Sequence, residues 1–267
     1  MHHRIANRAS IGIVTGMVAA LLLPVLSAVA KSKDKEPSRP PIVDPRADQL
    51  LREMGSYLAD SKQFSFRADI NYDEVLPTGQ KVQFAAIEDV AVQRPNRAYV
   101  EYQGDNGTKR MWYDGKQLTV IDNAENVYAT ASVPGKLDAA LDKMVDAHGF
   151  SPPLADLLYS DPYAVLKKHA IFGLYMGLSD VNGKRCHHLA FVDKEVDWQV
   201  WIEDGTETVP CKVVVTYKML PGSPQFSAVL SEWRLDERLA DTVFVPKIPD
   251  GVRKIDFANV EQGAAKP

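Results

Sequence analysis

The stretch Phe64–Tyr72 constrains the fold of this chain more than any other. Its residues alternate between two faces, and the polar face carries serine, arginine, aspartate and asparagine. The apolar face carries Phe64, Phe66, Ala68, Ile70 and Tyr72. This period of two predicts a strand with one buried and one solvated face. Such alternation is typical of antiparallel sheets, because buried parallel strands read as continuous apolar runs. Another part of the chain must therefore cover the apolar face.

The first thirty residues have the pattern of a secretory signal peptide. Arg4 and Arg8 form a basic start, and the apolar stretch 11–26 follows. Ala28 and Ala30 supply the small residues that signal peptidase requires, so we expect cleavage after Ala30 and a periplasmic protein. A retained membrane anchor is the alternative. The apolar run is short for a full span, so we expect no stable transmembrane anchor after cleavage.

The charge of the chain argues against nucleic acid as a partner. The full sequence has 31 Lys and Arg against 35 Asp and Glu, a net charge of −4. Removal of residues 1–30 takes away two arginines and no acid, so the mature chain is more acidic still. Nucleic-acid binding requires a basic surface, which this composition does not provide.

Composition and spacing divide the mature chain into three parts. Residues 31–43 are charged and rich in proline, and we expect a disordered linker there. Residues 44–257 are expected to form a single domain, and residues 258–267 a flexible tail. The domain begins with Asp44 and Pro45, a favourable cap and first position for a helix. Apolar residues at helical spacing extend this helix to about Asp60.

Strands with turn signals lie on both sides of a helical segment. Asp114-Gly115 and Asn182-Gly183 are strong hairpin signals between alternating segments. Between the two sets of strands, residues 134–169 show helical spacing. We expect about ten or eleven antiparallel strands, an N-terminal helix and this central helical insertion. Glu88 interrupts the apolar face of one strand, and we interpret it as the mark of a bulge, a twist or a sheet edge.

Cys186 and Cys211 are the only cysteines. An even number in an exported protein permits a disulfide. The expected strands place one strand between the two residues. A bond within the usual Cα separation limit of about 7 Å then requires that strand to end or bulge there. The sequence leaves this disulfide open.

No motif indicates catalysis or a metal site. His187 and His188 are neighbours in a predicted strand and point to opposite faces, so they cannot bind one metal together. The acids around Glu195 lack the glycine and spacing of an EF-hand. The nucleophile motif GxSxG, the motif SxxK with its accompanying signatures, and glycine-rich phosphate loops are absent. We therefore predict no catalytic residues, no metal and no cofactor.

Several short segments resemble a known family. They are Arg94-Pro95-Asn96, Trp112–Lys116, Tyr128-Ala129, Cys186–Phe191 and Asp197–Ile202. They are similar to a family of predicted periplasmic proteins, domain of unknown function 2092. The order of elements also resembles the half-barrel of the LolA/LolB carriers of lipoproteins and the LppX-type lipid binders. The resemblance implies a mainly β (α+β) fold. It would be a curved antiparallel half-barrel whose concave face is covered by the N-terminal helix and the central insertion.

The resemblance implies a non-catalytic binding or carrier protein for an apolar ligand. The expected partner is an apolar small molecule, a lipid or a lipidated protein, and an envelope protein is a further expected partner. The residues expected to line the ligand are Phe64, Phe66, Ile70, Tyr72, Val82, Phe84, Leu137, Leu141, Met144, Leu158, Trp198 and Val200. A cell-envelope interaction or structural module and a hydrolase are the alternatives. A cavity on the order of several hundred Å³ would favour a carrier, whereas a filled core would favour a structural module.

Overall fold

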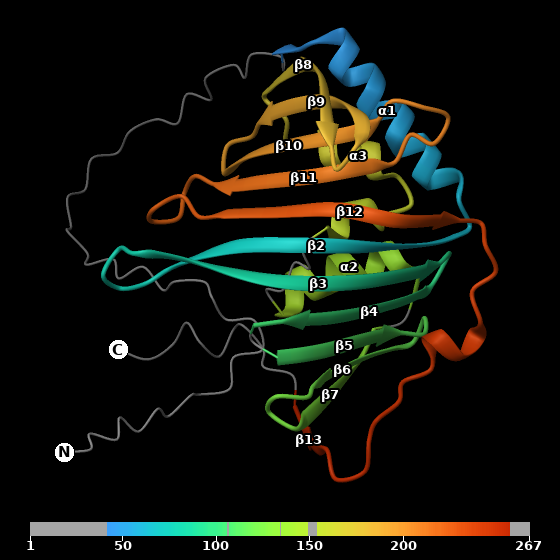
Figure 1. The fold of residues 1–267 in the computed structure, drawn as a ribbon. Coiled ribbons are helices and arrows are strands. Elements are labelled where there is room, and N and C mark those ends of the chain that lie inside the picture. The colour runs from blue at the N-terminus through green and yellow to red at the C-terminus, as the bar shows by residue number, and fades with distance from the viewer. Residues whose placement is uncertain (1–41, 106, 134, 149–153, 257–267) are drawn as a thin grey trace, which may run out of the picture. The chain divides into compact units, whose positions relative to one another are not determined.

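A curved sheet dominates the computed structural model, which describes residues 42–105, 107–133, 135–148 and 154–256 (Figure 1). Every described residue lies in one compact unit, Pro41–Pro267. The strands are β1 (Ile42–Val43), β2 (Gln63–Val75), β3 (Lys81–Gln93), β4 (Arg97–Gly104), β5 (Gly107–Tyr113), β6 (Gln117–Asp122), β7 (Val127–Ser132), β8 (Phe172–Val181), β9 (Lys184–Val192), β10 (Val196–Glu203), β11 (Pro210–Tyr217), β12 (Gln225–Leu235) and β13 (Arg253–Ile255).

The strands form one open sheet in the order β1-β8-β9-β10-β11-β12-β2-β3-β4-β5-β6-β7-β13. The eleven strands from β8 to β7 are all antiparallel, which confirms the expected mainly β sheet of about ten or eleven antiparallel strands. Two short parallel strands, β1 and β13, extend the sheet at its ends. The sequence does not predict β1, and β13 lies within residues 241–257, where the sequence predicts a short extended piece. Ile42 and Val43 fall in the expected linker, but main-chain bonds to β8 place them in the sheet.

The strand that begins at Gln63 lies at the centre of the sheet. β2 pairs with β12 on one side and β3 on the other, so it joins the two runs of consecutive strands (Figure 1). Phe64, Phe66 and Ile70 are buried, whereas Asp69 on the other face is exposed. The period of two predicted for this stretch is therefore confirmed. Its apolar side is the concave face, which carries the core.

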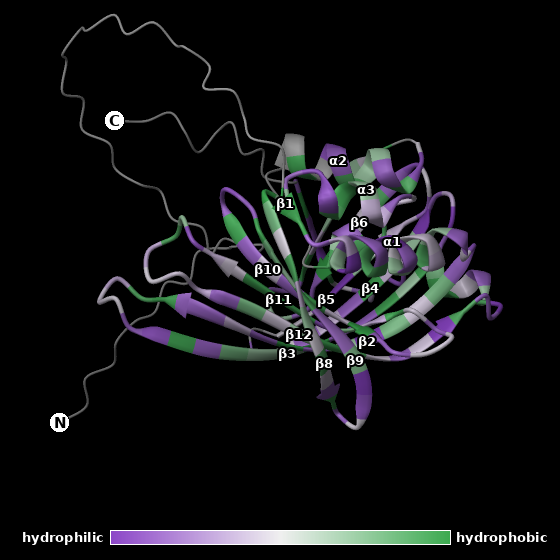
Figure 2. Cartoon of the chain, turned by 90° about the horizontal axis from the view of Figure 1, so that it is seen from above, coloured by the Kyte–Doolittle hydropathy of each residue, from purple (hydrophilic) through white to green (hydrophobic). Residues whose placement is uncertain are grey.

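The helices are α1 (Pro45–Asp60), α2 (Leu137–His148), α3 (Pro162–Lys167) and the 3-10 helices η1 (Ala155–Leu157) and η2 (Asp241–Phe244). Figure 2 shows α1, α2 and α3 on the same side of the sheet. α1 begins as predicted, because Asp44 Oδ1 accepts hydrogen bonds from the amides of Arg46 and Ala47, and Pro45 follows the cap. Among the described residues, no helix is long and apolar enough to cross a bilayer.

A close contact ties α3 to α1. A Cβ on Gly55 would lie 2.6 Å from the Cβ of Tyr163, so only glycine allows this approach of the two helices. Around it, Asp48 accepts hydrogen bonds from the hydroxyl of Tyr163, at 2.9 Å, and from Lys167. The guanidinium of Arg52 lies 4.2 Å from the centre of the Tyr163 ring. α3 is therefore held against α1 by both packing and charge.

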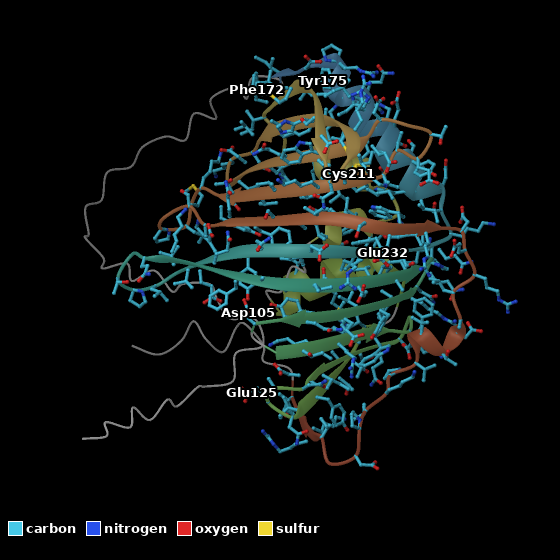
Figure 3. The ribbon with its side chains drawn as sticks, in the orientation of Figure 1. Asp105, Glu125, Phe172, Tyr175, Cys211 and Glu232 are labelled. Atoms are coloured by element: carbon cyan, nitrogen blue, oxygen red, sulfur yellow. The ribbon has the colours of Figure 1, made fainter. Side chains whose placement is uncertain are left out.

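The β8 end of the sheet is apolar and exposed. β1 pairs with Phe172 and Gly173, and within the described residues no other strand pairs with this edge of β8. Phe172 and Tyr175 lie at this end of the molecule (Figure 3). The exposed apolar residues here, called the β8 edge patch below, are Ile42, Ile171, Phe172, Leu174, Met176, Leu178 and Val192.

Candidate functional site

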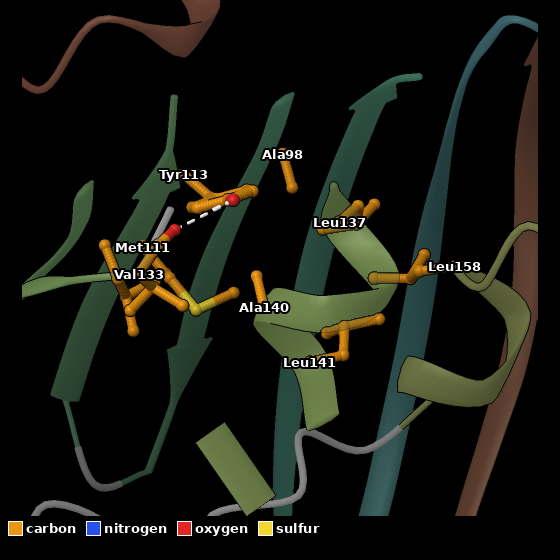
Figure 4. A pocket seen from close by; sticks show the side chains of 9 residues that line it. Ala98, Met111, Tyr113, Val133, Leu137, Ala140, Leu141 and Leu158 are labelled. Carbon is orange, nitrogen blue, oxygen red and sulfur yellow. Dashed lines mark hydrogen bonds between the residues drawn. The ribbon is translucent and has the colours of Figure 1, made fainter. Parts of the chain in front are cut away.

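The candidate site lies between the concave face and α2. We refer to α2, η1 and α3 together as the lid. A small void beneath α2 is lined by Ala98, Met111, Tyr113, Leu118, Val133, Leu137, Ala140, Leu141 and Leu158 (Figure 4). Its volume is about 10 Å³. This is space for about one water molecule, so the described part of the interface is packed in this conformation.

The only polar side chain of this lining is satisfied by the main chain. The hydroxyl of Tyr113 lies 2.9 Å from the carbonyl oxygens of Val133 and of Gly135, and can donate to either. Burial raises the pKa of Tyr113 above its ordinary value, so the hydroxyl keeps its proton. The space under α2 therefore has the character of hydrocarbon.

Arg94 anchors the lid to the sheet. One terminal nitrogen of its guanidinium donates to the carbonyl oxygen of Leu158 and the other to that of Tyr159, both at 2.7 Å. The guanidinium also lies 5.5 Å from the centre of the Phe64 ring. Such forked, charge-assisted bonds are strong and directional. Arg94 therefore joins the lid to β2 at the end of β3.

Further polar contacts hold the rim of the lid. The amide of Leu137 donates to the carbonyl of Pro95 at 2.8 Å, which fixes the start of α2. The hydroxyl of Tyr159 donates to Asp142 at 2.9 Å, and the amide of Ser160 donates to Asp138 at the same distance. These last two contacts are exposed to solvent. They can therefore exchange for water at modest cost.

Glu88 lies inside the concave face rather than at an irregularity. β2 and β3 pair without a register shift along their whole length, and β3 is internal to the sheet. The interpretation of Glu88 as the mark of a bulge or an edge was therefore wrong, because its cross-strand partners are Ala68 and Tyr102 of regular strands. Burial, together with the charge of Asp89, raises the pKa of Glu88 from 4.5 to about 8.

The family described as "Predicted periplasmic protein (DUF2092)" matches residues 47–258. This chain belongs to the DUF2092 family. The match covers most of the chain and confirms the family that the short segments resembled. The family description also agrees with the expected periplasmic location. The predicted signal peptide, the cleavage after Ala30, the linker up to residue 41 and the tail at 258–267 lie outside the described residues.

Solved structures similar to this DUF2092 protein include LppX from Mycobacterium tuberculosis, with 13% identity, a TM-score of 0.47 and coverage of 74% of this chain and 98% of that chain. An uncharacterized conserved protein from Thermus thermophilus has 7% identity, a TM-score of 0.48 and coverage of 79% and 99%. A LolA superfamily protein from Nitrosomonas europaea has 10% identity, a TM-score of 0.39 and coverage of 74% and 97%. These likenesses carry no conclusion about function. No curated protein sequence matches the chain.

Most residues expected to line a ligand belong to the apolar core of the DUF2092 domain, and their contact with a ligand stays a prediction. Those buried there are Phe64, Phe66, Ile70, Leu137, Leu141, Leu158, Trp198 and Val200. Tyr72 packs against them half-buried, and its ring stacks on Phe84 with 5.6 Å between ring centres. Val82 is half-exposed near the start of β3. The side chain of Met144 lies outside the described part of the structure.

The sequence prediction missed part of the lining of the void. Ala98, Met111, Leu118 and Val133 face the space under α2, together with the predicted Leu137, Leu141 and Leu158. The alternation of Ala98, Val100 and Tyr102 in β4 was a signal for one of these residues. It could not show which part of the long concave face α2 would cover.

The neighbouring histidines face opposite sides of the sheet, as predicted. His187 Nδ1 lies 2.9 Å from the hydroxyl of Tyr175, and its Nε2 lies 3.2 Å from Asp204. His188 stacks on Trp201 on the other side. The chain Tyr175–His187–Asp204 has the order of a catalytic relay, but neither the void under α2 nor the open depression beside Arg52 includes any of the three. Among the described residues, no group of three His, Cys, Asp or Glu side chains could hold a metal ion.

The two cysteines lie together on the convex side of the second run of strands. Cys186 of β9 and Cys211 of β11 are free thiols with exposed fractions of 0% and 2%. β10 lies between them, and its pairing with β11 shifts at Ile202, which pairs with Pro210, so Cys211 is the extra residue of a bulge. A hydrogen bond between the thiols lowers the pKa of Cys186 and raises that of Cys211. The bulge therefore lies in β11, whereas the middle strand β10 continues to Glu203, the partner of Cys186, and ends there.

We propose that Cys186 and Cys211 form a disulfide in the periplasm. Exchange with an oxidised dithiol protein would convert two thiols into one disulfide and leave that oxidant as a dithiol. The bond should raise the free energy of unfolding by about 3 kcal/mol, because it constrains the unfolded chain. Urea unfolding of oxidised and reduced protein checks this, with the double variant Cys186→Ser, Cys211→Ser as the control that should match the reduced form. Two titratable thiols in protein isolated from the periplasm would contradict the proposal.

Proposed function

We propose that this DUF2092 protein binds the hydrocarbon part of an apolar ligand, such as a lipid or a lipoprotein acyl chain, between the concave face and the lid. The observation that carries the proposal is the composition of this interface. The side chains that α2 turns toward the void are Leu137, Ala140 and Leu141, and the strands meet them with apolar side chains. The polar contacts that fix the lid lie at its margin, at Arg94 and the rim.

Binding requires the lid to move. A void of about 10 Å³ holds no acyl chain, whereas sites for such ligands measure on the order of several hundred Å³. When α2 lifts, the apolar side chains beneath it meet water at a cost of about 25 cal/mol per Å². A hydrocarbon chain in the opened space removes this cost by covering both surfaces. The closed conformation is therefore the ligand-free partner of an open, occupied one.

A pair of variants on one helix tests this proposal. Ala140 lies on the buried face of α2, and Ala139, its neighbour in the same helix, is exposed. We expect Ala140→Glu to weaken binding of a fluorescent fatty-acid probe about tenfold or more, because the carboxylate would meet the hydrocarbon of the ligand. Ala139→Glu adds the same charge to the outer face of the helix and should leave affinity unchanged. Circular dichroism confirms the fold of both variants.

The outcome for the parent protein decides the proposal. Native mass spectrometry after mild extraction should show co-purifying lipid, and the probe should bind. A clean ligand-free mass together with no probe binding would reject the ligand-binding function and favour a structural module. Equal affinity of Ala140→Glu and Ala139→Glu would place the ligand away from α2.

The β8 edge patch favours a second candidate function, docking of a protein of the cell envelope. Met176, with an exposed fraction of 55%, and Leu174 lie where β8 lacks a strand partner among the described residues. Exposed apolar patches and open strand edges are sites of protein association. Cross-linking in intact cells distinguishes the two functions. A stoichiometric protein partner captured at β8, with no lipid bound, supports docking rather than carriage.

A further inference from the structure

Glu88 is an acidic side chain buried in the interior of the concave face. It lies on β3 between Ala68 of β2 and Tyr102 of β4. Its exposed fraction is 7%, and Ala68 beside it is fully buried. The rows on either side of it are mostly apolar, with Ile70 and Ala86 on one side and Val90 and its partners on the other. A carboxyl group is therefore placed within the surface that we propose covers a hydrocarbon ligand.

One oxygen of this carboxyl group has no hydrogen-bond partner among the described residues. The atom is Oε2, which is buried. Tyr102 is the cross-strand partner of Glu88 on β4. Its hydroxyl lies 3.3 Å from the hydroxyl of Tyr72. A buried carboxylate is costly unless a cation or hydrogen-bond donors accompany it. The folded chain thus maintains an acceptor that its described residues leave unused.

The same row of the sheet shows how an acid is neutralised at this depth. Cross-strand pairing runs from Glu88 through Tyr102 and Lys109 to Asp122. Asp122 is buried, and Lys109 Nζ lies 2.7 Å from its Oδ2. The row therefore holds two buried acids and one cation. Lys109 pairs with Asp122, so Glu88 is left without a cation among the residues that the structure describes.

We propose that Glu88 receives the protonated amine of an amphiphilic ligand whose hydrocarbon chain lies along the concave face. The inference rests on the proposed function and specifies the ligand class for that site. An ammonium group supplies both the positive charge and the hydrogen-bond donors that Oε2 lacks. An anionic head would instead face an acidic group, so the site selects amines over carboxylates.

Three probes with twelve-carbon chains test this proposal by calorimetry at about pH 9, where Glu88, whose pKa is raised to about 8, has released its proton and an alkylamine keeps its own. They are dodecylamine, dodecanol and dodecanoate, each below its solubility limit or micelle concentration. We expect the parent protein to bind dodecylamine about tenfold or more tightly than dodecanol, as charge-assisted hydrogen bonds are worth at least that factor. Dodecanoate should bind no better than dodecanol. This order in the parent protein already decides the inference, whatever the behaviour of a variant.

Two variants locate the effect. Glu88→Gln keeps the size of the side chain and should abolish the preference for dodecylamine while leaving dodecanol affinity unchanged. Asp69→Asn removes one negative charge from the exposed opposite face of the adjacent strand, and the preference should remain. If dodecanol and dodecylamine bind equally to the parent, or if Glu88→Gln keeps the preference, Glu88 is no amine receptor and the ligand-binding function still stands. If no probe binds, the proposed function fails as well.

Discussion

Replacing Arg94 with methionine is expected to lower the free energy of unfolding by about 4 kcal/mol, since two charge-assisted hydrogen bonds of about 2 kcal/mol each are lost. The carbonyls of Leu158 and Tyr159 would lose the donor that fixes them. Methionine keeps most of the aliphatic stem, so the packing against Phe64 changes little. Urea unfolding gives the change in stability.

The same variant should free the lid before it affects the sheet. Hydrogen exchange of the α2 amides should become faster. The amides of β2 should still exchange only when the whole domain unfolds. Arg94→Lys is the matched control. Lysine retains the charge but cannot bond two carbonyls with one planar group, so we expect an intermediate loss. Unchanged exchange in α2 would show that Arg94 does not anchor the lid.

The Glu88→Gln variant is expected to become more stable than the parent as the pH rises. In the folded protein the pKa of Glu88 is raised from 4.5 to about 8. Between these values the folded protein holds a proton that the unfolded chain has released. The stability of the parent therefore falls as pH rises through this window. At 1.36 kcal/mol per pKa unit, the loss amounts to roughly 4–5 kcal/mol above pH 8.

Glutamine removes this titration, so the difference between variant and parent should be small below pH 4.5 and largest above pH 8. The groups that face Glu88 from neighbouring strands are Tyr102 and, through it, Tyr72, and Asp89 adjoins it along β3. The pKa of Tyr102 is raised above its ordinary value by burial, so its hydroxyl stays protonated throughout the window. Chemical unfolding at several pH values measures the effect. Parallel stability curves for the two proteins would contradict it.

Local patterns predicted the elements well because their causes are local. The alternation around Phe64 and the cap at Asp44 depend on residues a few positions apart, and both are confirmed. β1 was missed, and the place of β13 in the sheet was not predicted, because two or three residues carry no periodic signal and only their distant partners make them strands. Periodicity detected the charge at Glu88, but regular pairing with Ala68 and Tyr102 decides that it is interior.

The site was harder to predict because it depends on how surfaces meet. Helical spacing identified Leu137 and Leu141 as a buried face, yet it could not give the volume left under α2. In the same way, Tyr175, His187 and Asp204 come from two strands and a turn. No spacing along the sequence signals their contact. Arg94 belongs to a segment that resembles the family, but its role as an anchor depends on the fold.

The pairing of β2 with β12 has a consequence for how the protein matures. In the early run β2–β7 and in the late run β8–β12, each strand pairs with the next one in the sequence. The pairing of β2 with β12, by contrast, joins segments from opposite ends of the domain. Contacts so distant in sequence form slowly, because a long loop must close first. During export, β2 therefore keeps an unpaired edge until β12 has been translocated. The central strand of the finished protein is an exposed, aggregation-prone edge in the nascent one.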